Sequence, residues 1–507
     1  MRPELARGAW RRHLWLKATS VVGVGITAIA LMAQYGGGNL ASWWDVGESR
    51  SMPLTASVDD PTGSLRIYNN DGGVRTGGNA FFEPIGTNGR ACVTCHQPSN
   101  AMSLSTQIVQ ERWVETRGKD PVFAAIDGSN CPNLPQELRS SHSLLLDRGV
   151  FRIYLPWPGK AADGTAIKPD FKIEVVRDPT GCNTDPVYGL HSANPTISVY
   201  RRPRMVANLK YVLGSSEVFA TGTSSVHTAG MLTADGREPS LEAQAIDAAL
   251  AHEQAGKTPT EQQLEDILEF ESQIYVAQDF DVKAGDLSEV DGPFALSAWN
   301  LGKGKVNAGQ AGAPVFMAQG DWTTFDDGGS DVEKRAFRAS VVRGNAIFSS
   351  REFAIGETAN LHLPDGSAVP AHKAATGSCA TCHSAPMTGT AKGHGWMDIG
   401  TTTQAEAQDA PDLPLFKITC NADAKPHPYL GRVIYTNDPG RALVTGKCKD
   451  VGSIVMQQFR GLSARAPYFA NGSAKDLREV VDYYDRRFSI GLTERDKQDL
   501  INFMGVL

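Results

Sequence analysis

Two short motifs in the 507-residue chain carry side chains that could bind a redox cofactor. Both have the spacing C-x-x-C-H, and their members are Cys92, Cys95, His96, Cys379, Cys382 and His383. Two thiols at this spacing can add to the two vinyl groups of one porphyrin, and the adjacent imidazole can ligate the iron. The sequence therefore predicts two covalently attached c-type haems, with His96 and His383 as iron ligands.

Other readings of C-x-x-C are a thioredoxin-like thiol pair and half of a zinc site. The histidine that follows directly in both copies favours haem over either of these. The N-terminus favours haem as well, because five basic residues precede an uncharged run from Ala18 to Ala33. This is the layout of a secretory signal. Residues 1–33 are thus predicted to be a signal peptide or an uncleaved inner-membrane anchor, with the rest of the chain in the periplasm.

The remaining four cysteines form an even set, which is most simply paired in an oxidising compartment. They are Cys131, Cys182, Cys420 and Cys448. Proximity in the chain favours Cys131 with Cys182 and Cys420 with Cys448, although four cysteines allow three connectivities.

The composition is that of a globular protein, with 41% apolar and 21% charged residues. The formal charge of −7 argues against nucleic-acid binding, which needs clustered lysine and arginine. Arg201, Arg202 and Arg204 come nearest to such a cluster. An acidic body suggests that a protein partner docks through a basic face.

The pattern along the chain predicts two halves with one haem each. Residues 34–64 read as a linker, 65–284 as the N-terminal haem domain with an insertion, 285–331 as an inter-domain segment and 332–507 as the C-terminal haem domain. Apolar spacing predicts helices over 240–278, broken near Gly256, and over 332–348, 476–487 and 493–504. Ser240, Thr258 or Thr260, and Thr493 are the expected caps. Strand signals are limited to 152–155 and 171–176, so we expect a mostly α fold with loop-rich insertions and one short β-hairpin.

Three segments of the second half resemble the dihaem bacterial cytochrome c peroxidase family and its MauG-like branch. Residues 446–452, 459–474 and 477–484 read GKCKDVG, FRGLSARAPYFANGSA and LREVVDYY. In the first half, residues 201–212 and ADGREPSLEAQA at 234–245 resemble the segments that follow the first haem in that family.

This resemblance implies two cytochrome c-like domains and the reduction of hydrogen peroxide at the N-terminal haem. Electrons would arrive through the C-terminal haem from a small cytochrome or another redox protein. A MauG-like member would oxidise a partner protein instead, and a dihaem electron carrier with no substrate is a further alternative.

Three positions depart from the family pattern. The distal histidine expected sixteen residues after the first motif is Arg112, so the resemblance implies a first haem without that ligand. The tryptophan between the haems is replaced by Ala234, and the histidine after Pro-Tyr-Phe is replaced by Ala470.

Other family positions are retained. Gln244, His252 and Glu253 match the distal pocket of the first haem and are the candidate catalytic residues, although His252 could also be an ordinary helix residue. The distal ligand of the second haem corresponds to Tyr484, as in the MauG-like branch. A tyrosine packed in an amphipathic helix is the alternative for Tyr484.

If Tyr484 is not the ligand, a methionine could take its place, with Met387, Met397 and Met456 as candidates. Asn208, together with the carbonyls around Arg465 and Pro467, matches a calcium site between the domains.

Overall fold

The computed structural model describes residues 38–39, 42–161, 164–217, 232–288, 296–303, 322, 331–361, 374–383, 388–389 and 396–507. The predicted signal peptide or anchor, residues 1–33, lies outside these ranges. Within them, no helix is both long and apolar enough to cross a membrane.

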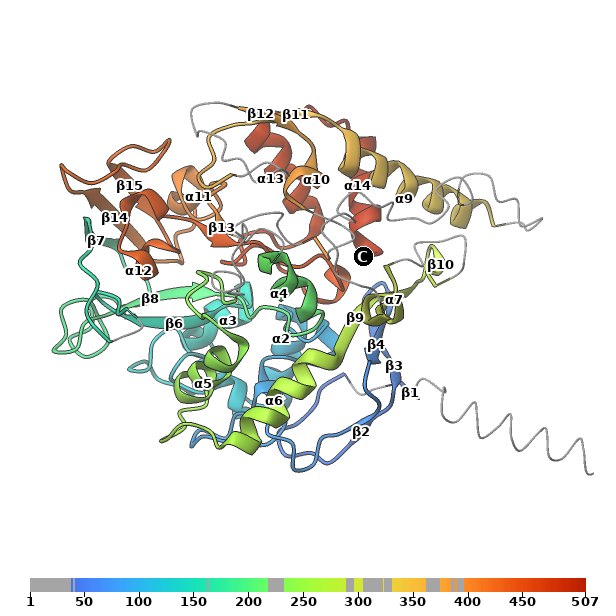
Figure 1. Ribbon diagram of the computed structural model, residues 1–507, viewed down its shortest axis with the longest axis horizontal. Coiled ribbons are helices and arrows are strands. Elements are labelled where there is room, and N and C mark those ends of the chain that lie inside the picture. The colour runs from blue at the N-terminus through green and yellow to red at the C-terminus, as the bar shows by residue number, and fades with distance from the viewer. Residues whose placement is uncertain are drawn as a thin grey trace, which may run out of the picture.

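A five-stranded sheet with the strand order β1-β3-β4-β9-β10 supports the first half of the chain (Figure 1). Strand β9 is buried along most of its length, and Ile67 of β4 lies opposite Val276 of β9. β1 runs parallel to β3, and the other neighbours are antiparallel. The sheet comprises β1 (Gly38–Asn39), β3 (Thr55–Asp60), β4 (Gly63–Asn69), β9 (Ile274–Asp281) and β10 (Gly285–Asp286). Residues 55–60, assigned to a linker from the sequence, are therefore part of this sheet.

The first half also contains helices, the last two of which pack against this sheet. They are α2 (Thr106–Thr116), α3 (Ser143–Arg148), α4 (Leu209–Glu217), α5 (Leu241–Ala251), α6 (Glu261–Gln273) and α7 (Ala298–Lys303). Ser240 caps α5 and Thr260 caps α6, as the sequence predicts. Ile274 and Tyr275, expected on the face of the second helix, instead begin β9.

The second half is built around the antiparallel packing of its first and last helices. Its helices are α9 (Val332–Ser350), α10 (Cys379–Cys382), α11 (Gln404–Gln408), α12 (Ala442–Thr445), α13 (Leu477–Phe488) and α14 (Glu494–Gly505). α9 and α14 pack closely because Gly344 has no side chain, since a Cβ there would lie 2.0 Å from the carbonyl oxygen of Asp499. The predicted cap of α14, Thr493, is confirmed, and Asp476 caps α13.

The two halves share a sheet. β7 (Phe171–Arg177) from the first half pairs with β14 (Leu415–Cys420), which also pairs with β15 (Val433–Thr436). Figure 1 shows β7 beside these C-terminal strands at one end of the molecule. The other short strands pair as β6 (Phe151–Pro156) with β8 (Thr196–Arg201), β2 (Ser51–Met52) with β5 (Val74–Arg75), β11 (Phe353–Ile355) with β12 (Ala375–Gly377), and β13 (Trp396–Met397) with β16 (Ile454–Val455).

The prediction of a mostly α fold is wrong, because several small sheets contribute alongside the helices. The two strands predicted in the insertion exist as β6 and β7, but they do not form a hairpin with each other. The expectation of two mostly helical, cytochrome c-like domains is corrected in the same way, since a strand of one half completes a sheet of the other.

Both predicted disulfides are confirmed: Cys131 pairs with Cys182, and Cys420 pairs with Cys448. The four cysteines of the C-x-x-C-H motifs are not part of a disulfide. The largest core cluster joins β4, β9 and α6 to the segment before the first motif, where the ring centroid of Phe270 lies 4.5 Å from that of Phe81 and 4.9 Å from that of Phe82. This packing fixes the position of the first motif.

Candidate active site

The two C-x-x-C-H motifs have the same local structure. In each, the hydroxyl of the threonine before the second cysteine accepts a hydrogen bond from the backbone N–H that precedes the first cysteine. The distance is 3.1 Å from Ala91 N to Thr94 Oγ1 and 2.9 Å from Ser378 N to Thr381 Oγ1. This bond closes a short turn, η1 (Cys92–Thr94) in the first motif and α10 in the second.

The histidines of the motifs are oriented in the same way. Nδ1 of His96 lies 3.2 Å from the carbonyl oxygen of Met102, and Nδ1 of His383 lies 3.0 Å from that of Gly389. A proton on Nδ1 satisfies this contact and leaves Nε2 unprotonated, which is the arrangement of a histidine that ligates a metal. Burial lowers the pKa of both imidazoles to about 4, so both are neutral at pH 7. The phenyl ring of Phe459 stacks on His383 at a centroid distance of 4.4 Å.

Each motif opens onto its own cavity. The first cavity, around Cys92, Cys95 and His96, has about 1370 Å³ of space not filled by atoms, part of it open to solvent. The second cavity, around the second motif, has about 1570 Å³. Two thiols outside any disulfide, a neutral imidazole and a cavity beside them therefore fit one haem at each motif.

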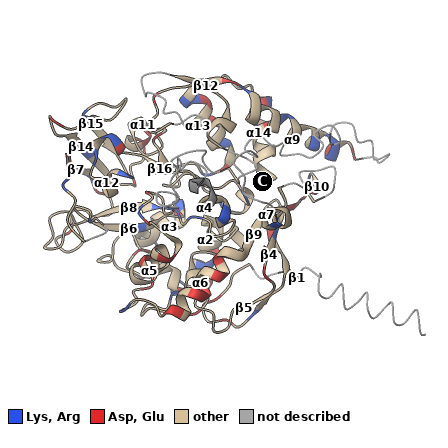
Figure 2. Cartoon of the chain, in the orientation of Figure 1, with Lys and Arg blue, Asp and Glu red and all other residues tan. Residues whose placement is uncertain are grey.

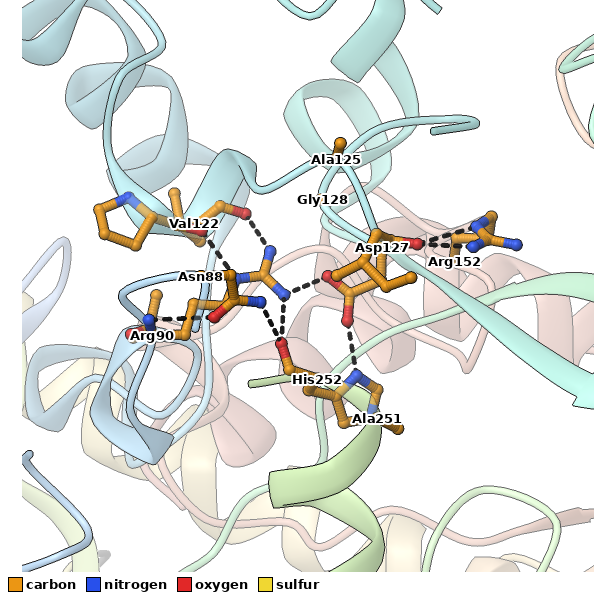
Figure 3. A network of polar contacts seen from close by, with 12 residues as sticks. Asn88, Arg90, Val122, Ala125, Asp127, Gly128, Arg152, Ala251 and His252 are labelled. Atoms are coloured by element: carbon orange, nitrogen blue, oxygen red, sulfur yellow. Dashed lines mark hydrogen bonds and ion pairs between the residues drawn. The ribbon is translucent and has the colours of Figure 1, made fainter. Parts of the chain in front are cut away.

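His252 lines the first cavity and is held by a buried carboxylate (Figure 3). It follows α5 directly, and its Nδ1 lies 2.6 Å from Oδ2 of Asp127. With the proton on Nδ1, the Nε2 atom is available as a base. Apart from His96, His252 is the one histidine among the described residues that line this cavity.

Asp127 is anchored by Arg90, and Figure 3 shows the guanidinium of Arg90 between Asp127 and the backbone around Val122. Both side chains are 1% exposed. Burial disfavours the Asp127 carboxylate, but the charge of Arg90 and the hydrogen bond from His252 outweigh it and lower the pKa of Asp127. Arg90 also donates a hydrogen bond to the carbonyl oxygen of Pro121. The backbone therefore holds Arg90 in place, and Arg90 holds the Asp127 carboxylate that orients His252.

Glu253 lies on the cysteine side of the same cavity. Its Oε1 is 3.5 Å from Sγ of Cys92, and its Oε2 accepts a hydrogen bond from Ile85 N. Gly86 permits this approach, because a Cβ there would lie 1.7 Å from the carbonyl oxygen of Glu253. Burial raises the pKa of Glu253 to about 7. Gln244 of α5 lines the cavity as well, so the three candidate catalytic residues lie around one space.

The three positions that depart from the family pattern make other contacts in the structure. Arg112 does not line the first cavity, but binds Asp120 and Glu115 and stacks on Trp43. Ala234 and Ala470 both pack against Ile454 in one buried cluster between the two cavities. The two replacements thus leave a small apolar contact where the family has larger side chains.

Tyr484 of α13 lines the second cavity, with its ring centroid 6.5 Å from that of His383. Within the described chain its hydroxyl makes no hydrogen bond, whereas the hydroxyl of the neighbouring Tyr483 donates to the carbonyl of Ile399. Burial raises the pKa of Tyr484. Met397 and Met456 line the same cavity, and Met387 lies outside the described residues.

Asn208 is fully buried, and its side-chain amide bonds both backbone groups of Val276 in β9. Nη2 of Arg202 lies 2.8 Å from the carbonyl oxygen of Arg465, where the resemblance places a calcium ligand. The guanidinium of Arg202 therefore binds the carbonyl oxygen that a calcium ion would need, and these residues do not fit a calcium ion there. No group of three or more metal-binding side chains gathers within the described ranges.

Comparison with known proteins adds one distant relationship. A cytochrome-c peroxidase, IdrP1 of Pseudomonas sp. (strain SCT), is 30% identical to this chain over 146 residues. The match covers 25% of this chain and spans 36% of the length of that relative. No protein-family model matches the chain, and neither does any solved structure.

Two residues of the first cavity went unnoticed in the sequence. Asp127 lies 125 positions from His252, in a loop whose sequence gives no signal of contact with it. Glu271 of α6 is 3% exposed, its Oε2 has no hydrogen-bond partner, and burial raises its pKa to about 8. A charged residue on the otherwise apolar face that carries Leu264 and Ile267 is the signal that could have identified Glu271.

Proposed function

We propose that this protein is a periplasmic two-haem c-type cytochrome that reduces hydrogen peroxide at its N-terminal haem. Electrons from a small cytochrome or another redox protein would enter through the C-terminal haem. The observation that carries the proposal is the Asp127–His252 pair, which faces the same cavity as the first C-x-x-C-H motif. The partial match to a cytochrome-c peroxidase and the repeated motif support it.

A haem held by Cys92, Cys95 and His96 would supply the electrons that break the O–O bond. Two electrons, two protons and one hydrogen peroxide give two water molecules. Nε2 of His252 would take a proton from the oxygen nearer the iron and return it to the leaving oxygen. Proton transfer of this kind is worth about 10²- to 10⁴-fold in rate.

The other residues of the cavity would support this transfer. Asp127 keeps the proton of His252 on Nδ1 and stabilises the imidazolium that forms when Nε2 is protonated. Gln244 can orient hydrogen peroxide through its amide. Glu253 and Glu271 are buried carboxyl groups that can hold protons near neutral pH.

Two features support the proposed location and partner. Two disulfides are typical of an oxidising compartment such as the periplasm. The chain has a formal charge of −7, and its exposed acidic residues include Glu261, Glu265 and Glu269 of α6, a helix on which Figure 2 colours acidic positions red. A donor with a basic face would bind an acidic protein of this kind more weakly as the salt concentration rises.

A second candidate function is the MauG-like oxidation of a partner protein. The free hydroxyl of Tyr484 in the second cavity favours it, because phenolate is a hard anionic ligand that stabilises ferric and higher oxidation states. Rapid turnover with a reduced small cytochrome would favour the peroxidase, and failure to oxidise any such donor would favour the alternative.

The peroxidase proposal is tested by stopped-flow mixing of the half-reduced holoprotein with hydrogen peroxide. We expect a fast absorbance change of the first haem in the wild type and a change at least about tenfold slower in His252→Ala. His191→Ala, at an exposed histidine outside both cavities, is the matched control and should react like the wild type. Equal rates in all three proteins would refute the role of His252.

A further inference from the structure

Three arginines meet at the wall between the two cavities. Arg202 lines both cavities, Arg204 lines the first and Arg465 lines the second. Arg202 and Arg204 belong to the basic cluster that the sequence shows after β8, and Arg465 comes from the second half of the chain. Arg202 and Arg465 are 7% and 6% exposed. The wall therefore concentrates buried positive charge between the two haem sites.

The hydrogen bonds of these arginines go to backbone carbonyls. Arg202 binds the carbonyls of Leu104 and Arg465, Arg204 binds those of Val455 and Met456, and Arg465 binds those of Arg460 and Gln458. Within the described part of the chain, none of the three forms an ion pair with a carboxylate. Nη1 of Arg202 is buried and makes no hydrogen bond at all there.

Other arginines of the first cavity differ in this respect. Arg201 lies 2.5 Å from Asp235 and 2.6 Å from Asp438, and Arg90 pairs with Asp127. Among the described arginines that line the first cavity, the absence of an acidic partner is therefore confined to Arg202 and Arg204.

An unpaired buried charge is costly, and three close together also repel one another. Burial and the charge of Arg465 lower the pKa of Arg202 to about 9 and that of Arg204 to about 10. Both remain cationic at neutral pH. The wall thus needs anions that the described part of the chain does not supply.

We propose that Arg202, Arg204 and Arg465 bind the propionate carboxylates of the two haems, which both point to this shared wall. The inference rests on the proposed function only in requiring two haems. Each haem carries two carboxylates on an otherwise apolar ring, and the guanidinium fork matches a carboxylate in shape and charge. Arg202, which lines both cavities, couples the two haems electrostatically.

Removing a positive charge beside a haem carboxylate disfavours addition of an electron, so the midpoint potential of that haem falls. Arg202 should affect both haems, whereas Arg204 should mainly affect the first and Arg465 the second. Direct contact with the haems predicts this division of effects between the two potentials, whereas a general loss of stability does not.

The test is a spectroelectrochemical titration of the holoprotein, with haem content measured as the pyridine haemochrome. Arg202→Gln is expected to lower the one-electron reduction constant of both haems at least tenfold, a shift of about 59 mV. Arg202→Lys keeps the charge and should shift both potentials by less than half as much. Arg152→Gln is the matched control, because Arg152 is buried without an ion pair but lies outside both cavities and stacks on Tyr154 and Tyr188.

Unchanged potentials in an Arg202→Gln protein that carries both haems would overturn the proposal. So would wild-type potentials that follow the concentration of added phosphate, since the wall would then hold a soluble anion. If Arg202→Gln does not fold, Arg204→Lys and Arg465→Lys provide the test instead. The resonance Raman spectra of these variants contain the bending bands of the haem propionates. Bands at the same positions as in the wild type would overturn the proposal. None of these readouts uses hydrogen peroxide, so a protein inert to peroxide with shifted potentials would refute the proposed function alone.

Discussion

Nδ1 of His252 lies 2.6 Å from Oδ2 of Asp127, although 125 residues separate them in the chain. The sequence suggests Glu253 as the carboxylate beside His252, but Glu253 contacts Cys92 and the backbone of Ile85 instead. The two adjacent residues therefore have different surroundings, since Asp127 orients the ring of His252 whereas Glu253 is a buried carboxyl group beside Cys92.

This pairing predicts that Asp127→Asn slows peroxide reduction. Asparagine can still accept a hydrogen bond from Nδ1, but it cannot stabilise a positively charged imidazole, so we expect kcat/KM to fall by about 10- to 100-fold. The substitution also removes the partner of the buried Arg90 and should lower the free energy of unfolding by about 3 kcal/mol. Steady-state kinetics and urea unfolding measure the two effects.

Glu253→Gln is the comparison for Asp127→Asn. It removes a buried carboxyl group from the same cavity and leaves the hydrogen bond between Asp127 and His252 in place, so we expect a smaller fall in kcat/KM than in Asp127→Asn. A larger loss of kcat/KM in Glu253→Gln than in Asp127→Asn would indicate that Glu253, and not His252, is the base.

A second prediction concerns cofactor content. The shared geometry of the two motifs leads us to expect two covalent haems per chain, and one haem in each of the double variants Cys92→Ala/Cys95→Ala and Cys379→Ala/Cys382→Ala. Intact mass and haem staining after denaturing electrophoresis measure this. A wild-type mass with fewer than two haems would contradict it.

Tyr484→Phe should change the spectrum of the second haem and leave the first unchanged, because the hydroxyl of Tyr484 makes no hydrogen bond within the described chain. Tyr483→Phe is the matched control, since that hydroxyl binds the backbone of Ile399. Absorption spectra of the ferric proteins give the answer. Identical spectra for wild type and Tyr484→Phe would favour Met397 or Met456 as the ligand.

A further prediction concerns stability and pH. The pKa of Glu271 is raised to about 8 in the folded protein, so between pH 4.5 and 8 the native state binds more protons than the unfolded state. Stability should therefore fall as pH rises through this range, by roughly 1.4 kcal/mol for each tenfold difference in proton affinity.

Glu271→Gln should lose less stability than the wild type over this range, because glutamine does not ionise. Urea unfolding of the holoproteins at pH 5 and pH 8 measures the difference. Parallel losses in both proteins would show that Glu271 is not the group responsible.

The elements that could be predicted from the sequence are those with local signals. α5, α6 and α14 begin at Ser240, Thr260 and Thr493 because each cap bonds a backbone N–H three residues ahead. The two C-x-x-C-H motifs and the two disulfides depend on spacing and proximity in the same way. Local chemistry was enough for these features.

The features that escaped prediction depend on contacts between distant residues. β7 pairs with β14, more than 200 positions later, and a short strand carries no mark of its partner. Asp127 meets His252 only when its loop packs against the end of α5, and the arginines of the shared wall come together only when segments of both halves meet. Alternating patterns indicate a strand, but they do not say which sheet it joins.

The central claim is that the first haem has an open distal side facing His252, and the spin state of its iron tests this most directly. Electron paramagnetic resonance of the ferric and half-reduced holoprotein should show a high-spin signal from the first haem, because Arg112 stands where a distal histidine would be and lies outside the cavity. Imidazole added to either preparation should convert that signal to low spin. A first haem that is already low-spin in both preparations, and inert to peroxide, would contradict the account and identify the protein as an electron carrier.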